Sequence, residues 1–144
     1  PCPKKAGTIR ETTGNTLGTN VKNTGNVVLA QSANITQASG ATTIVIPANS
    51  QILEITVFVT TVWDGAAATF GVGTTALATK FTAAAAATGG TVGIVSITPS
   101  TDATRTAAFI DVGTADAKIV VTSANTGAGV GVITVRYVQN LNLL

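Results

Sequence analysis

The stretch QILEITVFVTTVW, residues 51–63, alternates with a period of two. Successive side chains of a β-strand point to opposite faces of a sheet, so this period predicts a strand with two different faces. One face is apolar and is expected in the core: Leu53, Ile55, Val57, Val59 and Trp63. The other face is mixed: Ile52, Glu54, Thr56, Phe58 and Thr60. Because Ile52 and Phe58 would be exposed there, we expect the N-terminal segment or a second copy of the chain to half cover that face.

Similar short runs rich in Val, Ile and Thr continue from Val27 onward, separated by turn residues. Such runs favour strands, and Pro47 and Pro99 would each end one because proline cannot donate to a sheet ladder. We predict an all-β fold, an antiparallel β-sandwich or jelly roll of about eight strands with an extended N-terminal arm. The predicted strands are 26–31, 42–47, 51–63, 67–73, 91–98, 108–113, 117–123 and 129–139.

Two of the segments between the predicted strands have sequence signals of their own. Asp64-Gly65 follows the long alternating run and is a turn signal, which predicts a hairpin or tight connection with Trp63 anchoring the core beside it. The segment TALATKFTAAAAAT, residues 75–88, is expected to be either a short helix or an Ala-rich crossover loop, because alanine favours helices but the surrounding pattern is β.

The length of 144 residues predicts one domain, here residues 26–144, preceded by an arm over residues 1–25. The arm is rich in Thr, Asn, Gly and Lys, and its few apolar residues have no period, so it has no core of its own. Two interpretations stay open: an ordinary disordered terminus, or an arm that orders on a neighbouring molecule.

Charge is scarce and unevenly placed. Only 10% of the residues are charged, so Thr, Ser, Asn, Gln and Gly must cover much of the surface, which favours assembly with other subunits. The arm holds four of the eight cations, Lys4, Lys5, Arg10 and Lys22, against one acid. There is no longer basic run and no interleaving of aromatic with basic residues, so nucleic-acid binding is not indicated.

The sequence offers little for catalysis, metals or cofactors, and we predict none of these. The absence of histidine excludes His-assisted nucleophiles, and Cys2 is the only cysteine. Asp111 and Asp116 could contribute to a calcium loop, but such a site needs six to eight oxygen ligands. The G-x-G-x-x-A spacing at 71–76 lacks the acidic residue that a dinucleotide site requires after the next strand, so we interpret its glycines as allowing close packing.

No apolar stretch has membrane-spanning length, and residues 1–15 show no secretory signal, so synthesis in a cytoplasm and no membrane partner are expected.

Two segments resemble a pattern found in small virion proteins of tailed bacteriophages. The first, TTIVIPANSQILEITVFVTTVWDGAAATFGVGTTALATKF (42–81), has an I-P-A-x-S entry, an alternating strand, an aromatic-Asp-Gly turn and a strand ending in Val-Gly. The second, GVGVITVRYVQN (129–140), resembles the closing strand of the same group. Together they cover about a third of the chain.

The resemblance implies a β-sandwich, often a jelly roll, that assembles on the virion as an oligomer. Within that group we expect a head decoration (cement) protein on the capsid surface, a trimer whose partner is the major capsid protein. Lys4, Lys5, Arg10 and Lys22 would then bind the capsid, and Ile52 and Phe58 would contribute to the oligomer interface. The alternatives are a tail- or head-fibre domain that binds a host glycan, and a free carbohydrate-binding module.

Overall fold

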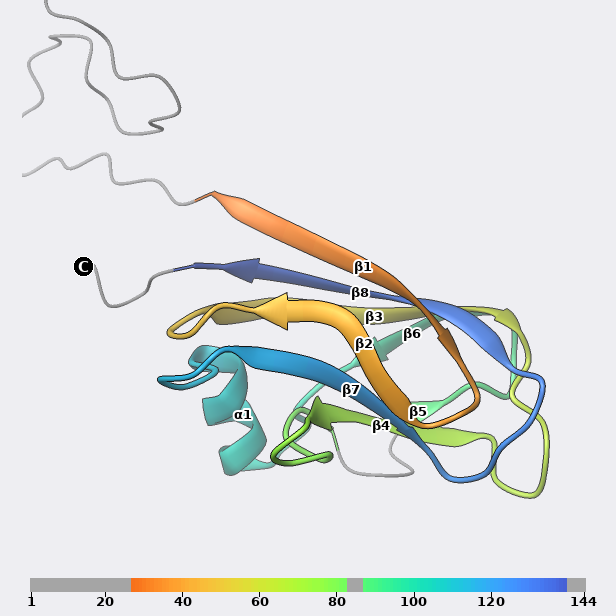
Figure 1. Cartoon of the computed structure of the whole chain (residues 1–144). Coiled ribbons are helices and arrows are strands. Elements are labelled where there is room, and N and C mark those ends of the chain that lie inside the picture. Colours follow the sequence, from red (N-terminus) through yellow and green to blue (C-terminus); the bar gives the residue numbers. More distant parts are fainter. Residues whose placement is uncertain (1–26, 83–86, 140–144) are drawn as a thin grey trace, which may run out of the picture.

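The computed structural model describes residues 27–82 and 87–139. These residues form eight strands and one helix (Figure 1). In chain order the elements are β1 (Val28–Thr36), β2 (Gly40–Ile46), β3 (Gln51–Thr61), β4 (Thr69–Thr74), β5 (Ala87–Thr88), β6 (Gly93–Ile97), α1 (Ala103–Ile110), β7 (Ala117–Ser123) and β8 (Val130–Val138).

The strands form two four-stranded antiparallel sheets that pack face to face. Sheet A has the order β1-β8-β3-β6 and sheet B has the order β2-β7-β4-β5. The first strand pairs with the last, the second with the seventh, the third with the sixth and the fourth with the fifth. This nested pairing is that of a long hairpin rolled into a sandwich, which is the jelly-roll topology. The predicted antiparallel β-sandwich is therefore confirmed.

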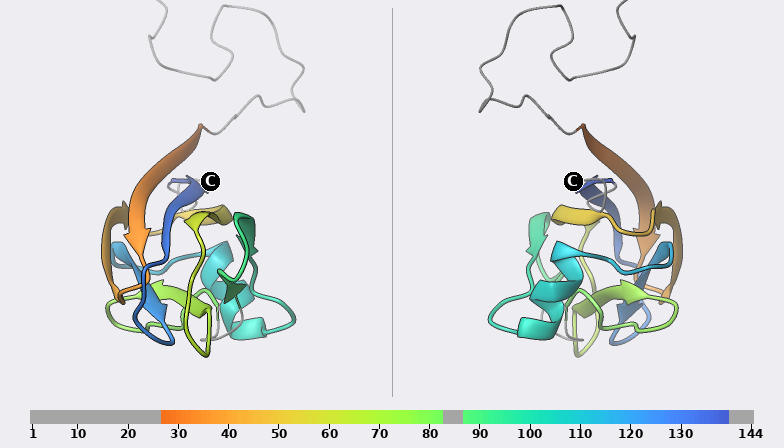
Figure 2. Two further views of the ribbon diagram at one scale, coloured as in Figure 1. Left: turned by 90° about the vertical axis from the view of Figure 1, so that its right-hand side faces the viewer. Right: turned by 90° about the vertical axis from the view of Figure 1, so that its left-hand side faces the viewer.

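The two sheets face each other across the core (Figure 2). The core contains buried apolar side chains from both sheets. Ile55, Val57 and Val59 of β3 are fully buried, as their spacing predicts, and Trp63 is 2% exposed just beyond the strand. Burying apolar side chains such as these provides the main favourable free energy of folding.

The start of β3 corrects one prediction. Leu53 was expected in the core but is 43% exposed, whereas Ile52 was expected on the outer face but is only 3% exposed. The pairing of β3 with β8 shifts between Ile52 and Glu54, so Leu53 is an extra residue in the ladder. An extra residue reverses the alternation of faces. Ile52 therefore belongs to the core and offers no surface to a second copy.

Residues 108–113 correct a second prediction, because the first half of this expected strand belongs to helix α1 and the second half forms no strand. The helix begins after Asp102, whose side chain accepts a hydrogen bond from the Arg105 backbone N–H at 2.9 Å. An aspartate in this N-cap position satisfies a backbone donor that has no partner within the helix. The local capping signal therefore outweighs the strand propensity of the apolar residues that follow.

The segment 75–88 falls only partly within the described residues. Residues 75–82 form turns and no helix, residues 87–88 form the short strand β5, and 83–86 lie outside the described ranges. Gly73 of β4 explains why the turn can fold back here, because a Cβ atom on Gly73 would collide with the Ala78 backbone. Close packing is therefore the role of this glycine, as its spacing predicts.

The strand directions divide the molecule into two ends. One end consists of four loops, residues 37–39, 62–68, 89–92 and 124–129, which we call the loop cap; it faces the viewer in the left view of Figure 2. At the opposite end β1 begins, β8 finishes and α1 lies (Figure 1). The predicted arm, residues 1–25, lies outside the described residues.

Candidate interaction surface

Among the described residues, no group of three or more His, Cys, Asp or Glu side chains could hold a metal ion. In the same part of the chain, no helix is long and apolar enough to cross a membrane.

Gln37 joins three loops of the cap with a fully buried side-chain amide. Its Nε2 donates to the Asp64 carbonyl oxygen at 2.6 Å, and its Oε1 accepts from the backbone N–H groups of Asp64 at 2.9 Å and Gly129 at 3.1 Å. Its own backbone N–H donates to the Gly129 carbonyl oxygen at 2.8 Å. A buried amide whose donor and acceptor are both satisfied fixes the positions of its neighbours.

Trp63 connects the fourth loop, residues 89–92, to the other three. Its backbone N–H donates to the Gly89 carbonyl oxygen at 2.9 Å, and its Nε1 donates to the Ser123 hydroxyl at 3.2 Å. A Cβ atom on Gly89 or Gly129 would come within 2.8 Å or 2.7 Å of the indole ring, so both positions require glycine. The four loops of the cap are thus held together by the buried Gln37 amide and by the backbone of the buried Trp63.

The loop at Asp64-Gly65 is not a hairpin, because β3 belongs to sheet A and β4 to sheet B. It is instead the connection that carries the chain from one sheet to the other. Gly65 has a φ of +92°, a left-handed conformation that glycine adopts without strain. Of the two predicted alternatives, a hairpin or a tight connection, the structure shows the connection, and Trp63 is buried in the core as predicted.

The loop cap is almost free of charge. Its residues are Gly, Ala, Ser, Thr, Val, Asn, Gln and Trp, with Asp64 as the one ionisable side chain. The Asp64 carboxylate accepts from the Ala128 backbone N–H at 3.3 and 3.4 Å, and the Asn125 amide donates to the Asp64 carbonyl oxygen at 2.9 Å. The remaining charged side chains of the described residues lie away from the cap: Glu54, Lys80, Asp102, Arg105, Asp111, Asp116, Lys118 and Arg136.

Exposed apolar side chains border the cap on the outer face of sheet A. Phe58 is 47% exposed and lies in register with Ile94 of β6, which is 70% exposed, and with Val132 of β8. Further exposed valines flank these residues. We call the set the apolar rim: Phe58, Val62, Val92, Ile94 and Val130.

The middle of the outer face is more polar than the part beside the cap. The next row across sheet A carries hydroxyl groups, from Ser32 and Thr134, whose oxygens are 2.8 Å apart, to Thr56 and Ser96. Beyond it Arg136 pairs with Glu54 at 3.0 Å, an exposed ion pair that contributes little stability. Ile94, the most exposed large apolar side chain of the described residues, lies beside the loop cap, whereas Val28 and Leu53 at the opposite end are 47% and 43% exposed.

The predicted interface residues separate on this surface. Phe58 lies exposed on the outer face as predicted, whereas Ile52 is buried. Lys4, Lys5, Arg10 and Lys22 lie outside the described residues. Sequence reasoning missed Val92 and Ile94, although the alternation GIVSI in β6 could have identified Ile94 as an outward-facing residue.

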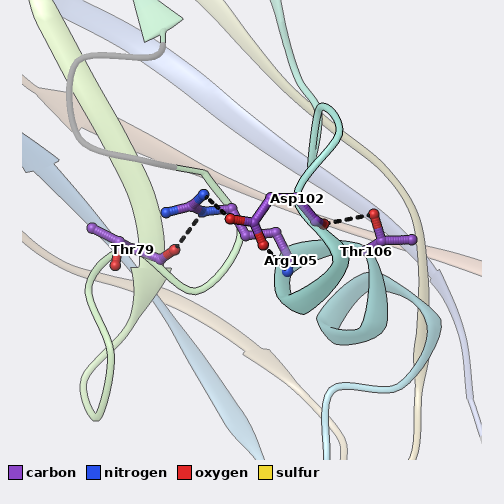
Figure 3. Close-up of polar contacts among 4 residues, drawn as sticks. All are labelled: Thr79, Asp102, Arg105 and Thr106. Atoms are coloured by element: carbon purple, nitrogen blue, oxygen red, sulfur yellow. Dashed lines mark hydrogen bonds and ion pairs between the residues drawn. The ribbon is translucent and has the colours of Figure 1, made fainter.

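A hydroxyl-rich groove of about 540 Å³ runs beside α1, away from the cap, and is lined in part by Ser96, Thr98 and Arg105. Arg105 is held in place there (Figure 3): its Nη1 donates to Asp102 at 2.7 Å and its Nε donates to the Thr79 carbonyl oxygen at 3.2 Å. Thr106 also donates its hydroxyl to the Asp102 carbonyl oxygen at 2.9 Å. These contacts position α1 against the 75–82 turn, so we assign Arg105 a structural role.

The N-cap of α1 leads to a prediction for pH. The Arg105 backbone N–H, helped by the guanidinium charge, holds the pKa of Asp102 below its usual value. Because its pKa is lower in the folded state, ionised Asp102 stabilises the folded protein at pH values above its unfolded pKa of about 3.9. This stabilisation is lost as the pH falls through the folded-state pKa. The chain has no histidine to titrate between pH 5 and 8. We expect a constant thermal midpoint from pH 5 to 8, measured by circular dichroism, with a decline only below about pH 4.

Asp102→Asn is the control for this pH dependence, because asparagine keeps the capping oxygen but does not titrate. Its decline in acid should be smaller than that of the parent chain. A midpoint that changes by more than about 5 °C between pH 5 and 8 would show that another ionisable group controls stability.

No protein-family model matches the chain, and no curated protein matches it significantly. Two solved structures contain similar chains. One is described as the acidic stable capsid structure of Helicobacter pylori bacteriophage KHP30, with a TM-score of 0.48 and 15% identity over 78% of this chain and 87% of that chain. The other is the cyanophage Pam1 capsid asymmetric unit, with a TM-score of 0.47 and 18% identity over 90% of this chain and 96% of that chain.

Proposed function

We propose that this chain is a structural protein of a bacteriophage virion, a head decoration (cement) protein that binds the outer capsid lattice and stabilises it. In this proposal it is a homo-oligomer, a trimer, and its partner is the major capsid protein. It is made in the host cytoplasm and resides on the capsid surface. It has no catalytic role and needs no cofactor.

One observation supports this proposal: the nearly uncharged loop cap and apolar rim lie at the end of the jelly roll opposite to the start of β1, the strand that follows the cation-rich segment in the sequence. The loop cap and the apolar rim are rigidly built and nearly uncharged. The chain enters β1 at the other end, where Val27 follows a segment with four of the eight cations. A protein with two separate binding surfaces can link neighbours, as a cement protein must.

The resemblance of the sequence to virion proteins adds support. The segment 42–81 contains most of β2 and all of β3 and β4, and the segment 129–140 contains β8. These strands span both sheets, so the resemblance concerns the framework of the jelly roll and does not rest on one isolated loop. Because one fold hosts many functions, the proposal relies on the surfaces as well as on this framework.

Stabilisation of a capsid would follow from binding several coat subunits at once. Each additional contact is made at a high effective concentration once the first has formed, so several weak contacts give tight binding. Only the intact lattice presents the complete site, and a ligand that binds only the intact state stabilises that state by mass action. Decoration would therefore oppose the expansion caused by packaged DNA.

Deletion of residues 1–22 is the experiment that tests this function. The deletion removes Lys4, Lys5, Arg10 and Lys22 but leaves β1 and the whole described sandwich intact. We expect the truncated protein to keep its thermal midpoint within a few degrees, because the core is unchanged. We expect at least a tenfold loss of affinity for the capsid, measured by co-sedimentation with empty capsids at physiological salt.

Two variants refine the result. Replacing the four arm cations by serine should reproduce most of the loss if charge drives binding, whereas Lys118→Ser, which removes an exposed cation from the body, should have no effect. Capsid binding at full strength without residues 1–22 would exclude the arm as a capsid-binding segment.

The carbohydrate-binding alternatives receive less support. Sugar-binding modules stack sugar rings on exposed aromatic side chains, but Trp63 and Tyr137 are 2% and 5% exposed, and Phe70 and Phe81 are fully buried. Among the aromatic rings of the described residues, Phe58 is the one that is largely exposed, and it lies among aliphatic side chains of the rim.

A further inference from the structure

We infer that the loop cap and the apolar rim together form the surface through which copies of this chain bind one another. This inference rests on the proposed function and specifies its self-association surface. Self-association can be tested in solution without a capsid. The result is therefore independent of the test of capsid binding by the arm, and either test can fail while the other succeeds.

The apolar rim consists of five exposed apolar side chains. Ile94 is 70% exposed, Val92 61% and Phe58 47%, and Val62 and Val130 are each 39% exposed. Their register brings Phe58 and Ile94 side by side on the outer face of sheet A. Isolated exposed apolar residues are ordinary, but a contiguous group marks an interaction site, because burying it releases water from apolar surface.

The loops of the cap behind this rim are fixed by hydrogen bonds. Gln37 holds three of its loops by hydrogen bonds of 2.6 to 3.1 Å, and Trp63 holds the fourth by a hydrogen bond of 2.9 Å. Loops that must become ordered on binding lose conformational freedom and weaken the complex. Loops already fixed by buried side chains avoid that loss, so this surface is prepared for binding.

The near absence of charge on the cap favours a second copy of this chain as its binding partner. A partner recognised by charge would find only Asp64 in the cap, and its carboxylate already accepts from the Ala128 N–H. Two caps of this chain can meet without bringing a cluster of like charges together, because each presents the same nearly uncharged surface of small residues to the other. β1 begins at the end of the sandwich opposite to the cap, so binding through the start of this strand would leave the cap available to neighbouring copies.

The test compares Ile94→Lys with Ile110→Lys. Both isoleucines are exposed, at 70% and 56%, but Ile94 lies in the rim and Ile110 at the end of α1 beside the opposite end of the sandwich. Sedimentation equilibrium of the full chain, over a range of concentrations, should show self-association of the parent and of Ile110→Lys. Ile94→Lys should weaken association at least tenfold. Thermal unfolding of each variant checks that both remain folded.

A second pair varies the cap itself. Ala66→Arg places a long cation on an exposed loop of the cap, whereas Ala115→Arg places it in an exposed loop at the opposite end. Only Ala66→Arg should reduce association. A parent chain that stays monomeric at every concentration would overturn the inference, as would equal behaviour within both pairs. Loss of capsid co-sedimentation by Ile94→Lys, with no self-association of the parent, would assign the surface to the coat protein and would likewise overturn it.

Discussion

Val57→Asp is expected to prevent folding. Val57 is fully buried in the middle of β3 and lies in register with Ile133 of β8 and Val95 of β6. A carboxylate placed there would lose its hydration and find no cation among its apolar neighbours. The cost of burying an unpaired charge, several kcal/mol, is comparable with the total stability of a domain of this size, about 5–15 kcal/mol. Circular dichroism of the purified variant should show no cooperative thermal transition.

The neighbouring position supplies the matched control. Phe58 follows Val57 in the same strand but points to the outer face, where it is 47% exposed. Phe58→Asp should fold and unfold cooperatively, with a thermal midpoint close to that of the parent chain, and should instead weaken self-association. A folded Val57→Asp, or an unfolded Phe58→Asp, would contradict the assignment of the two faces of β3.

The two faces of β3 illustrate what the sequence can predict. Alternation depends only on backbone geometry, so the buried positions Ile55, Val57 and Val59 follow directly from a period of two. The exception at Ile52 and Leu53 arises because β8 pairs with β3 around one extra residue. That shift depends on a strand that lies far away in sequence, so a local pattern contains no sign of it.

Helix α1 was wrongly predicted for a different reason. The residues AFIDVG, 108–113, have the apolar character of a strand, and this similarity led to the wrong prediction. A local signal was nevertheless present, because Asp102 precedes a segment with several alanines, and aspartate is a preferred N-cap residue. Short helices and strands are difficult to separate by apolar content alone.

The candidate surface was only partly predictable for a physical reason. Phe58 could be assigned to an outer face from β3 alone. The rim around it comes from β6 and β8, and its continuity depends on pairings such as Phe58 with Ile94 and Phe58 with Val132. Gln37 gave no signal at all, because it stands in a polar stretch and acquires its role only when Asp64 and Gly129 are folded against it.

Gln37→Glu is expected to destabilise the protein strongly at neutral pH. The substitution keeps the shape of the side chain, and its oxygen can still accept from the Asp64 and Gly129 N–H groups. The group that donates to the Asp64 carbonyl oxygen at 2.6 Å is replaced by a second carboxylate oxygen, in a site with no exposed surface. A buried charge beside a carbonyl oxygen should cost about 3–5 kcal/mol, which lowers the thermal midpoint by about 10 °C or more.

The pH dependence of this variant separates the loss of the donor from any loss of packing. Burial and the facing carbonyl oxygen would raise the pKa of the introduced carboxyl group in the folded state above its value of about 4.3 in the unfolded chain. Once protonated, that carboxyl group can donate to the Asp64 carbonyl oxygen again, so its stabilising contribution is present below the unfolded pKa and is lost as the pH rises through the folded pKa. The deficit relative to the parent should therefore be small at pH 4 and large at pH 7. Gln139→Glu, at an exposed position, should show no deficit at either pH, and an equal deficit at both pH values for Gln37→Glu would assign the effect to packing and exclude the hydrogen bond as its cause.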